Sequence, residues 1–323
     1  MELFLAQPRG FCAGVVRAVD IVELALQVYK PPIYVFHEIV HNHHVVTDLE
    51  RKGAVFIDQL GEVPSGAVTI FSAHGVPDQV VAEARKRQLN IIDATCPLVT
   101  KVHLQGQRYS QRGYAVVIVG HMDHQEVIGT KGSIDGEVYV LSTPEEVAGL
   151  NPSNPEKVAY VTQTTLSLDD TRDVIRALKA RFPNIVGPGL DDICYATQNR
   201  QNAVRDLAQQ VDLVLVVGSS NSSNTNRLRD VAQQSGVAAY LIQDETGIDL
   251  QWLVDKPRIG ITAGASAPER LVQGVIRKLQ ELGGGEVQLM DGIDESTVFR
   301  LPRQLLEASL IATSQQSAIE QCN

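Results

Sequence analysis

Three cysteines, Cys12, Cys96 and Cys194, each lie where a short apolar run ends and a helix is predicted to begin. They are spaced at comparable intervals along the chain, and Cys96 precedes Pro97, a residue favoured in the first turn of a helix. The positive end of a helix stabilises a thiolate, which is the form of cysteine that binds metals. A single such cysteine is commonly a core residue. Three in matching positions favour loops that converge on one metal site.

The ligand type narrows the choice of metal. Thiolates suit zinc or an iron-sulfur cluster, and the sequence has no C-x-x-C pair of the kind found in structural zinc sites. A 4Fe-4S cluster normally has four cysteine ligands, so three would leave one iron open to a substrate. Cys322 lies in a polar C-terminal segment where disorder is expected, and we treat it as incidental.

Three histidines form a second set, each in a loop after an apolar run: His41 in EIVHNHH, His74 in SAHG and His124 in GHMDHQE. Imidazole can ligate a metal or donate a hydrogen bond to an anion. Because sulfur already provides metal ligands, we favour the anion. Glu126 follows in the same loop as His124, and a carboxylate in a closed cavity could deliver protons. An ordinary exposed or helix-capping glutamate remains an open alternative at this point.

Loops rich in hydroxyl and amide groups form a third set. Ser222, Ser223 and Asn224 lie in GSSNSSNTNR, Ser266 in TAGASAP and Thr164 in VTQTTLS. Uncharged donors just before a helix suit a phosphate group, although each loop alone could consist of ordinary turn and cap residues. Neither G-x-x-x-x-G-K-[ST] nor a G-x-G-x-x-G after a strand is present, so no motif supports a nucleotide.

The elements that must position these loops alternate between strand and helix. Short apolar runs separated by amphipathic helices predict an α/β fold with mostly parallel sheets covered on both faces. Strands are predicted at residues 3–6, 33–40, 68–72, 91–94, 116–120, 158–162, 213–218 and 259–263, and helices at 14–29, 77–88, 168–181 and 268–282.

A weak internal repeat follows each cysteine, with the polar loops at similar distances from it. We therefore predict three similar αβα domains in a pseudo-threefold arrangement around a central cavity. Their predicted ranges are 1–96, 97–193 and 194–285, with a C-terminal arm and loose tail at 286–323. The polar loops would lie beyond the carboxyl ends of the strands, where open parallel sheets bind ligands.

Composition excludes several classes of protein. The net charge of −10 argues against a nucleic-acid or anionic-membrane surface. No run approaches the roughly 20 apolar residues of a membrane-spanning helix, and the N-terminus fits neither a signal nor a transit peptide. Four cysteines in a chain of 323 residues do not form a typical disulfide framework. We expect a cytoplasmic protein.

Long motifs carry a resemblance to a known family. They are PRGFCAGVVRA, HEIVHN, SAHG, DATCPLV, GHMDHQEV, VTQTTLS, DDICYATQNRQ, VGSSNSSNTNRL and TAGASAP. In this order, from Ala6 to about Gly285, the chain resembles the 4-hydroxy-3-methylbut-2-enyl diphosphate reductase (LytB) family. The resemblance implies three α/β domains around a cavity that holds an oxygen-sensitive 4Fe-4S cluster with three cysteine ligands and one open iron.

The resemblance also implies roles for individual residues. Cys12, Cys96 and Cys194 match the cluster ligands, and Glu126 matches the proton donor. Thr164 matches a hydroxyl that orders the substrate alcohol or a water beside this glutamate. The positions that match diphosphate ligands or lie beside them are His41, His74, His124, Ser222, Ser223, Asn224 and Ser266, of which His124 is also near the proton path.

The implied reaction is the reductive dehydroxylation of an allylic diphosphate to isopentenyl and dimethylallyl diphosphate, the last step of the methylerythritol phosphate route to isoprenoids. The chain has no recognisable flavin or nicotinamide site, so electrons would come from an external one-electron donor such as a ferredoxin or flavodoxin. Two alternatives are a hydro-lyase with an open-iron cluster and no net redox change, and an iron-sulfur sensor or binding protein.

Overall fold

The computed structural model describes residues 1–189 and 192–322 of this α/β chain. It contains three sheets, in which every strand pair is parallel. The chain forms two compact units. Unit 1 comprises residues 1–12, 105–122 and 135–297, and unit 2 comprises residues 13–104, 123–134 and 298–323. The predicted fold class, α/β with mostly parallel sheets, is confirmed.

Unit 1 holds a five-stranded sheet and a three-stranded sheet. The first has the order β10 (Ala238–Ile242), β9 (Leu213–Val217), β11 (Arg258–Ala263), β1 (Glu2–Leu5) and β12 (Val287–Leu289). The second has the order β7 (Val138–Leu141), β6 (Ala115–Val119) and β8 (Val158–Thr162). The helices of unit 1 are α6 (Leu168–Arg181), α7 (Tyr195–Ala208), α8 (Ser223–Gln234) and α9 (Glu269–Glu281).

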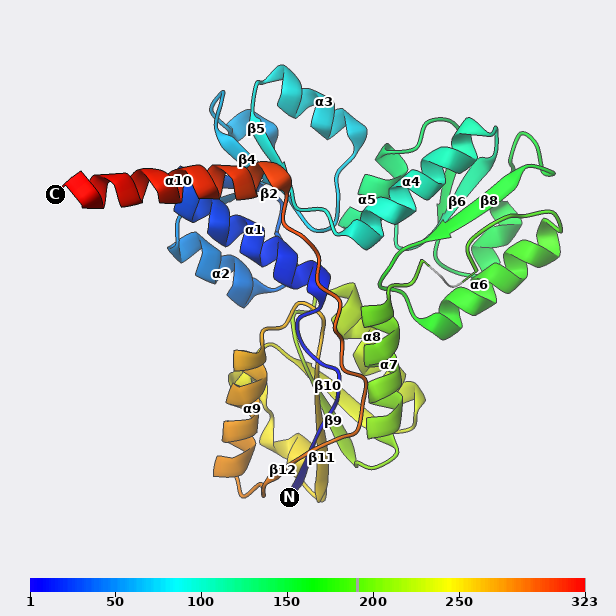
Figure 1. The fold of residues 1–323 in the computed structure, drawn as a ribbon. Helices are drawn as coiled ribbons and strands as arrows, with labels where there is room; N and C mark the ends of the chain where they lie inside the picture. Colours follow the sequence, from blue (N-terminus) through cyan, green and yellow to red (C-terminus); the bar gives the residue numbers. More distant parts are fainter. Residues whose placement is uncertain (190–191, 323) are drawn as a thin grey trace. The chain divides into compact units, whose positions relative to one another are not determined.

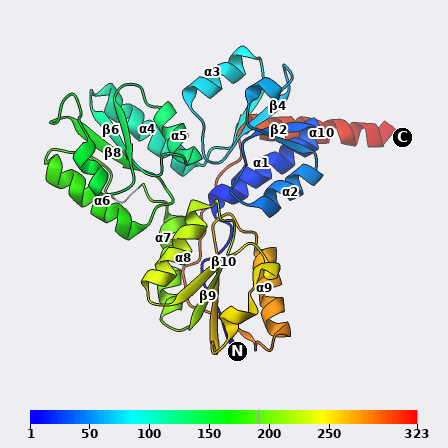
Figure 2. The same ribbon diagram turned by 180° about the vertical axis from the view of Figure 1, so that it is seen from behind.

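The five-stranded sheet shows why an almost wholly apolar strand forms here. Along β9, Leu213, Leu215 and Val217 pack into one core cluster with α9, whereas Val214 and Val216 pack into another with α7 and α8. Successive side chains of a strand point to opposite faces, so both faces require apolar residues when helices cover both. Figure 1 and Figure 2 show α9 on one side of this sheet and α7 and α8 on the other.

Unit 2 is built on a four-stranded sheet with the order β3 (Ala54–Ile57), β2 (Ile33–Phe36), β4 (Val68–Phe71) and β5 (Asn90–Asp93). Its helices are α1 (Ala13–Tyr29), α2 (His43–Arg51), α3 (Asp78–Lys86), α5 (Gln125–Gly132) and α10 (Arg303–Cys322). Helix α4 (Pro97–Gln111) contributes residues to both units, and short 3₁₀ turns lie at Leu60–Glu62, Glu145–Gly149, Glu245–Gly247 and Leu250–Leu253. No helix in the described part of the chain is long and apolar enough to cross a membrane.

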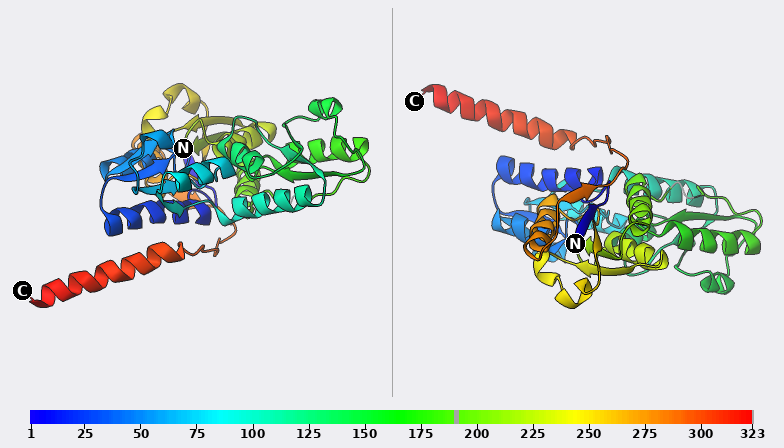
Figure 3. Two further views of the ribbon diagram at one scale, coloured as in Figure 1. Left: turned by 90° about the horizontal axis from the view of Figure 1, so that it is seen from above. Right: turned by 90° about the horizontal axis from the view of Figure 1, so that it is seen from below.

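Two regions differ from what the sequence predicts. Strand β1, which we expected within residues 1–96, lies between β11 and β12, so the start of the chain is built into the sheet formed by its last third. The expected loose tail instead forms α10, which runs alongside α1 (Figure 3). Leu305 of this helix is fully buried, and Gln304 Nε2 donates a 2.6 Å hydrogen bond to the carbonyl of Ile91. The three-domain boundaries and the central cavity stay predictions.

Candidate active-site residues of the two units

Unit 2 brings the three predicted histidines together. The rings of His41 and His74 stack with centroids 4.0 Å apart, and His124 lies edge-on to both, at 5.3 and 5.9 Å. His41 and His74 lie in the loops that follow β2 and β4, whose carboxyl ends share one edge of the parallel sheet. Burial, followed by the charges of His41, His124 and His37, holds the pKa of His74 well below its usual value of 6.5. His74 is therefore neutral at pH 7.

Hydrogen bonds assign the proton positions of the other two rings. His124 is the N-cap of α5, and its Nδ1 accepts the backbone N–H of Glu126 at 3.1 Å. The proton of neutral His124 is then on Nε2, which can donate to an anion. His41 Nδ1 lies 3.0 Å from Glu38 Oε2 and donates to that carboxylate. Only the protonated form of His41 therefore has a second N–H to donate.

Glu126 and Cys96 complete the predicted residues of unit 2. The side chain of Glu126 is buried in the first turn of α5, although its neighbour Asp123 is exposed. Cys96 immediately precedes α4, as predicted, and its N–H donates to the carbonyl of Ala73 at 3.0 Å. That bond ties the cysteine loop to the loop of His74.

Unit 1 holds Cys12 and Cys194 in different ways. Cys194 is the N-cap of α7, where its sulfur accepts the backbone N–H of Thr197 at 3.4 Å and lies 3.0 Å from the Thr197 hydroxyl. Cys12 lies in the loop after β1, and its N–H donates to the carbonyl of Ala265 at 3.2 Å. All three candidate cysteines are partly exposed.

The donor chemistry of these thiols fits an iron-sulfur cluster. Soft sulfur ligands suit such a cluster, and the backbone N–H of Thr197, which donates to the sulfur of Cys194, would stabilise a thiolate there. The cysteines are divided between the units, two in unit 1 and one in unit 2. Within the described ranges, no group of three or more His, Cys, Asp or Glu side chains is arranged to hold a metal ion.

The predicted hydroxyl and amide residues of unit 1 lie on connected loops. Ser222 caps α8 by accepting the N–H of Thr225, and Asn224 Oδ1 accepts the N–H of Ala265 at 2.8 Å in the loop that carries Ser266. Asn224 Nδ2 reaches Thr197 Oγ1 at 3.5 Å, beside Cys194. Ser222, Asn224, Ser266 and Thr164 are all buried. The hydrogen bond of Asn224 thus joins two of the loops that the sequence predicts to bind phosphate, the loop of Ser222 and the loop of Ser266.

Thr164 is linked to the same region through the backbone. Its carbonyl accepts the N–H of Cys194 at 3.1 Å. The neighbouring Gln163 donates to Thr165 Oγ1 at 2.9 Å and to Ser223 Oγ at 3.4 Å, and its Oε1 accepts the N–H of His121 at 3.1 Å. Gln163 therefore joins three loops, a role that the sequence analysis did not assign to it.

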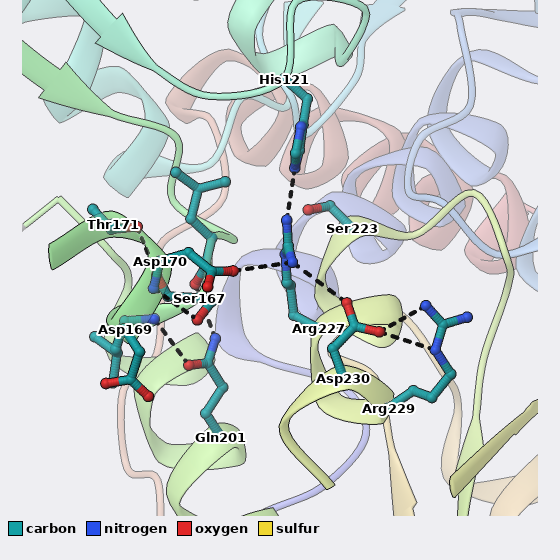
Figure 4. A network of polar contacts seen from close by, with 12 residues as sticks. His121, Ser167, Asp169, Asp170, Thr171, Gln201, Ser223, Arg227, Arg229 and Asp230 are labelled. Atoms are coloured by element: carbon teal, nitrogen blue, oxygen red, sulfur yellow. Dashed lines mark hydrogen bonds and ion pairs between the residues drawn. The ribbon is translucent and has the colours of Figure 1, made fainter. Parts of the chain in front are cut away.

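Arg227 is a second residue that the sequence analysis did not single out. One guanidinium nitrogen lies 3.1 Å from His121 Nε2, and another contacts Asp170 at 3.2 Å and Asp230 at 3.4 Å (Figure 4). Burial and then the positive charge of Arg227 lower the pKa of His121. Neutral His121 accepts from Arg227, which links the loop after β6 to α8. A cavity of about 330 Å³ adjoins this contact.

Comparisons with known proteins identify the family of the chain. The model of the family described as LytB protein matches residues 3–280. The 4-hydroxy-3-methylbut-2-enyl diphosphate reductase of Klebsiella pneumoniae subsp. pneumoniae is 56% identical over 94% of this chain and 98% of its own length. The protein of the same name from Bordetella pertussis is 59% identical over 94% of both chains.

Solved structures give the same result. The E-1-hydroxy-2-methyl-but-2-enyl-4-diphosphate reductase of Plasmodium falciparum matches with a TM-score of 0.91 and 40% identity, covering 97% of this chain and 99% of its own. A second (E)-4-hydroxy-3-methyl-but-2-enyl diphosphate reductase matches with a TM-score of 0.63 and 34% identity, over 87% of this chain and 100% of its own. The chain belongs to the LytB family.

Proposed function

We propose that this chain reduces 4-hydroxy-3-methylbut-2-enyl diphosphate to isopentenyl diphosphate and dimethylallyl diphosphate, the last step of the methylerythritol phosphate route. The observation that carries the proposal is the identity of 56% and 59% to two reductases of that name over 94% of the chain. The reaction breaks a C–O bond, forms a C–H bond and releases water, and it consumes two electrons and two protons.

The cysteines are proposed to hold the cofactor. Cys12, Cys96 and Cys194 would ligate a 4Fe-4S cluster, and the hydrogen bond from the backbone N–H of Thr197 to the sulfur of Cys194 supports a thiolate there. When bound, the cluster would supply electron transfer and an open iron that acts as a Lewis acid. The electrons would come from an external one-electron donor of the ferredoxin or flavodoxin class.

Polar residues of both units are proposed to serve the diphosphate. In unit 2, the Nε2–H of His124 and a protonated His41 would donate to its oxygens, with His74 stacked beside them. In unit 1, Asn224, with Ser222, Ser223 and Ser266 around it, would supply uncharged donors at the start of α8. A helix N-terminus with such donors favours a phosphate group.

Glu126 is proposed to deliver the proton that converts the leaving hydroxyl to water. Its side chain is buried, and its backbone N–H fixes the ring of His124. Thr164, also buried, would order the substrate hydroxyl or a water for this transfer. We also propose a cytoplasmic location, as expected from the sequence.

Anaerobic turnover with a dye tests the proposal. The cluster-loaded protein, given substrate and reduced methyl viologen, should oxidise two viologens for each substrate consumed and form both product diphosphates, measured by absorbance and mass spectrometry. Isopentenyl diphosphate supplied in place of the substrate should leave the dye reduced. Substrate consumption without a donor would indicate a hydro-lyase, and binding without dye oxidation would indicate a sensor.

A further inference from the structure

A C-terminal segment of unit 1, residues 290–297, follows the start of the chain closely. The N–H of Met290 donates to the carbonyl of Leu5 at 3.0 Å, and Gln7 Nε2 donates to Asp294 Oδ1 at 3.1 Å. A Cβ at Gly292 would lie 2.0 Å from the Gln7 carbonyl oxygen, so only glycine permits this approach. The segment lies beyond residues 3–280, which the family model matches.

Glu295 in this segment reaches α7. Its carboxylate accepts hydrogen bonds from Arg200 at 3.0 to 3.1 Å and from Asn199 Nδ2 at 3.0 Å. The Arg200 side chain is 1% exposed and that of Glu295 is 12% exposed. Arg200 is therefore a fully buried cation whose countercharge comes from a segment 95 residues away.

The remaining N–H groups of Arg200, which lies in α7, bind the loop before Cys12 and the first turn of the same helix, next to Cys194. Nε and one terminal nitrogen donate to the Gly10 carbonyl at 3.0 and 2.8 Å, and the same terminal nitrogen reaches the Phe11 carbonyl at 3.3 Å. The other terminal nitrogen donates to the Ala196 carbonyl at 2.9 Å. Gly10 and Phe11 immediately precede Cys12, and Ala196 lies two residues after Cys194.

We propose that Arg200, held in place by Glu295, is a positioning residue that fixes the Cys12 loop to the first turn of α7 and so presets the two thiols of unit 1 for the cluster. The inference rests on the proposed function, because it presumes that these thiols bind a cluster. It adds that Glu295, in the segment of residues 290–297, keeps the guanidinium in contact with both the Cys12 loop and the first turn of α7.

The chemistry of the arginine side chain explains why no other residue would serve. A guanidinium has five N–H donors in a rigid plane, enough to bind three backbone carbonyls and both oxygens of one carboxylate. Lysine would keep the charge but lose the planar arrangement. Glutamine at position 295 would keep the shape of the glutamate side chain and one acceptor, but it would leave the arginine charge without its counterion.

The experiment compares Glu295→Gln with Asp212→Asn. Asp212 forms an ion pair of similar geometry with Arg258 in the same unit, at 2.8 and 3.2 Å, and that pair touches no cysteine loop. After anaerobic reconstitution, iron and sulfide are counted, and the loss of visible absorbance is followed when an iron chelator is added. Unfolding of the cluster-free proteins by guanidinium chloride is measured in parallel.

Glu295→Gln should release iron about 10-fold to 100-fold faster than the wild type, the usual effect of removing a group that orients a metal ligand, with the cluster-free protein still folded. Asp212→Asn should release iron within about 2-fold of the wild-type rate. If the Arg200→Lys protein folds, it should release iron as fast as Glu295→Gln. If Arg200→Lys does not fold, the iron release of Glu295→Gln alone tests the inference.

Equal iron release by the wild type and Glu295→Gln would overturn the inference. The inference would also be overturned if Glu295→Gln released iron faster than the wild type only under conditions in which its cluster-free form is already unfolded. That result would mean that the ion pair only stabilises the fold. Wild-type protein that takes up no cluster at all would instead contradict the proposed function. The failures of the two proposals are therefore distinguishable.

Discussion

The two units provide candidate site residues of opposite character. Seven of the eight histidines lie in unit 2, and only His121 lies in unit 1. The candidate diphosphate residues of unit 2 are three imidazoles in mutual ring contact, whereas those of unit 1 are hydroxyls and an amide placed by helix N-caps and backbone hydrogen bonds. Histidine changes its charge near neutral pH, and serine and asparagine do not.

This difference predicts two different roles for the two sets of residues in the proposed function. The donors of unit 1 keep the same charge across the physiological pH range, so they can supply constant affinity. In unit 2, imidazole is a side chain that can take part in proton transfer, although burial keeps His74 itself neutral. The buried carboxylic side chain of Glu126 lies two residues after His124. We therefore expect variants of unit 2 to change proton-dependent steps and variants of unit 1 to change binding.

The largest expected effect tests whether both units are required. Cys96→Ser in unit 2 and Cys194→Ser in unit 1 should each strongly deplete the broad visible absorbance of the cluster and lower turnover more than about 100-fold, because each removes a proposed ligand. Iron and sulfide counting after anaerobic reconstitution checks this. Cys322→Ser is the control and should keep the absorbance. A Cys96→Ser protein with a normal iron content would remove unit 2 from the cluster site.

Glu126→Gln should lower kcat by about 10² to 10⁴-fold and leave KM within a few-fold of the wild-type value, because the proton is lost but the shape is kept. Steady-state rates with reduced viologen measure both constants. Asp123→Asn, in the same loop but exposed, is the matched control and should behave as the wild type. A wild-type rate for Glu126→Gln would mean that another group supplies the proton.

The stability of the cluster-free protein should depend on pH through His103 of unit 2. Burial, partly opposed by Asp93, lowers the pKa of His103 from 6.5 to about 4. Between pH 6.5 and pH 4 the unfolded chain therefore binds more protons than the folded chain does. Free energy of unfolding that is present above pH 6.5 is lost as the pH falls toward 4. The shift corresponds to at most about 3 kcal/mol.

Urea unfolding at pH 7 and at pH 4.5 measures this loss of stability. His103→Gln should lose clearly less unfolding free energy between the two pH values than the wild type does, because the group that titrates is gone. His43→Gln, which removes an exposed histidine of the same unit, should lose as much as the wild type. Equal losses for wild type and His103→Gln would show that this ring does not cause the acid sensitivity.

A smaller effect is expected for Asn224→Asp in unit 1. The new carboxylate can still accept the N–H of Ala265, but it cannot donate, and its charge repels a diphosphate. Losing one hydrogen bond to a charged group should raise KM by about 10 to 100-fold with a smaller change in kcat. Asn202→Asp adds the same charge on the exposed face of α7 and should leave KM unchanged. A fall in kcat alone would contradict the division of roles between the units.

Local patterns in the sequence predicted individual elements well. The strand at 158–162 and the helix at 168–181 have the predicted bounds, because apolar runs and helical periodicity report burial directly. The pairing of β1 with β11 was not predictable, since any apolar strand could occupy that place in the sheet. The loose tail was a wrong expectation. Its polar composition favours disorder, whereas the structure has a helix at Arg303–Cys322 that contacts α1 and in which Leu305 is fully buried.

In the candidate site, too, local features were predictable from the sequence and long-range contacts were not. The position of each histidine after a strand is visible in the sequence, and the structure confirms that the three rings meet. The tautomer of His124 depends on one backbone hydrogen bond. The pairing of Arg200 with Glu295 joins residues that no local motif connects. Long-range hydrogen bonds of this kind follow from the fold and leave no periodic signal.

The place of β1 between β11 and β12 affects how the protein is made. Residues 2–5 emerge from the ribosome long before their partners at 258–261 and 287–289. At about 5 to 20 residues per second, the first strand waits for roughly 10 to 60 seconds before its sheet can close. Cys12 must wait as well, because its N–H bonds to the carbonyl of Ala265. The loop of Cys12 is therefore not held in its final place until Ala265 has been made, and a cofactor that needs this thiol would be inserted after that point.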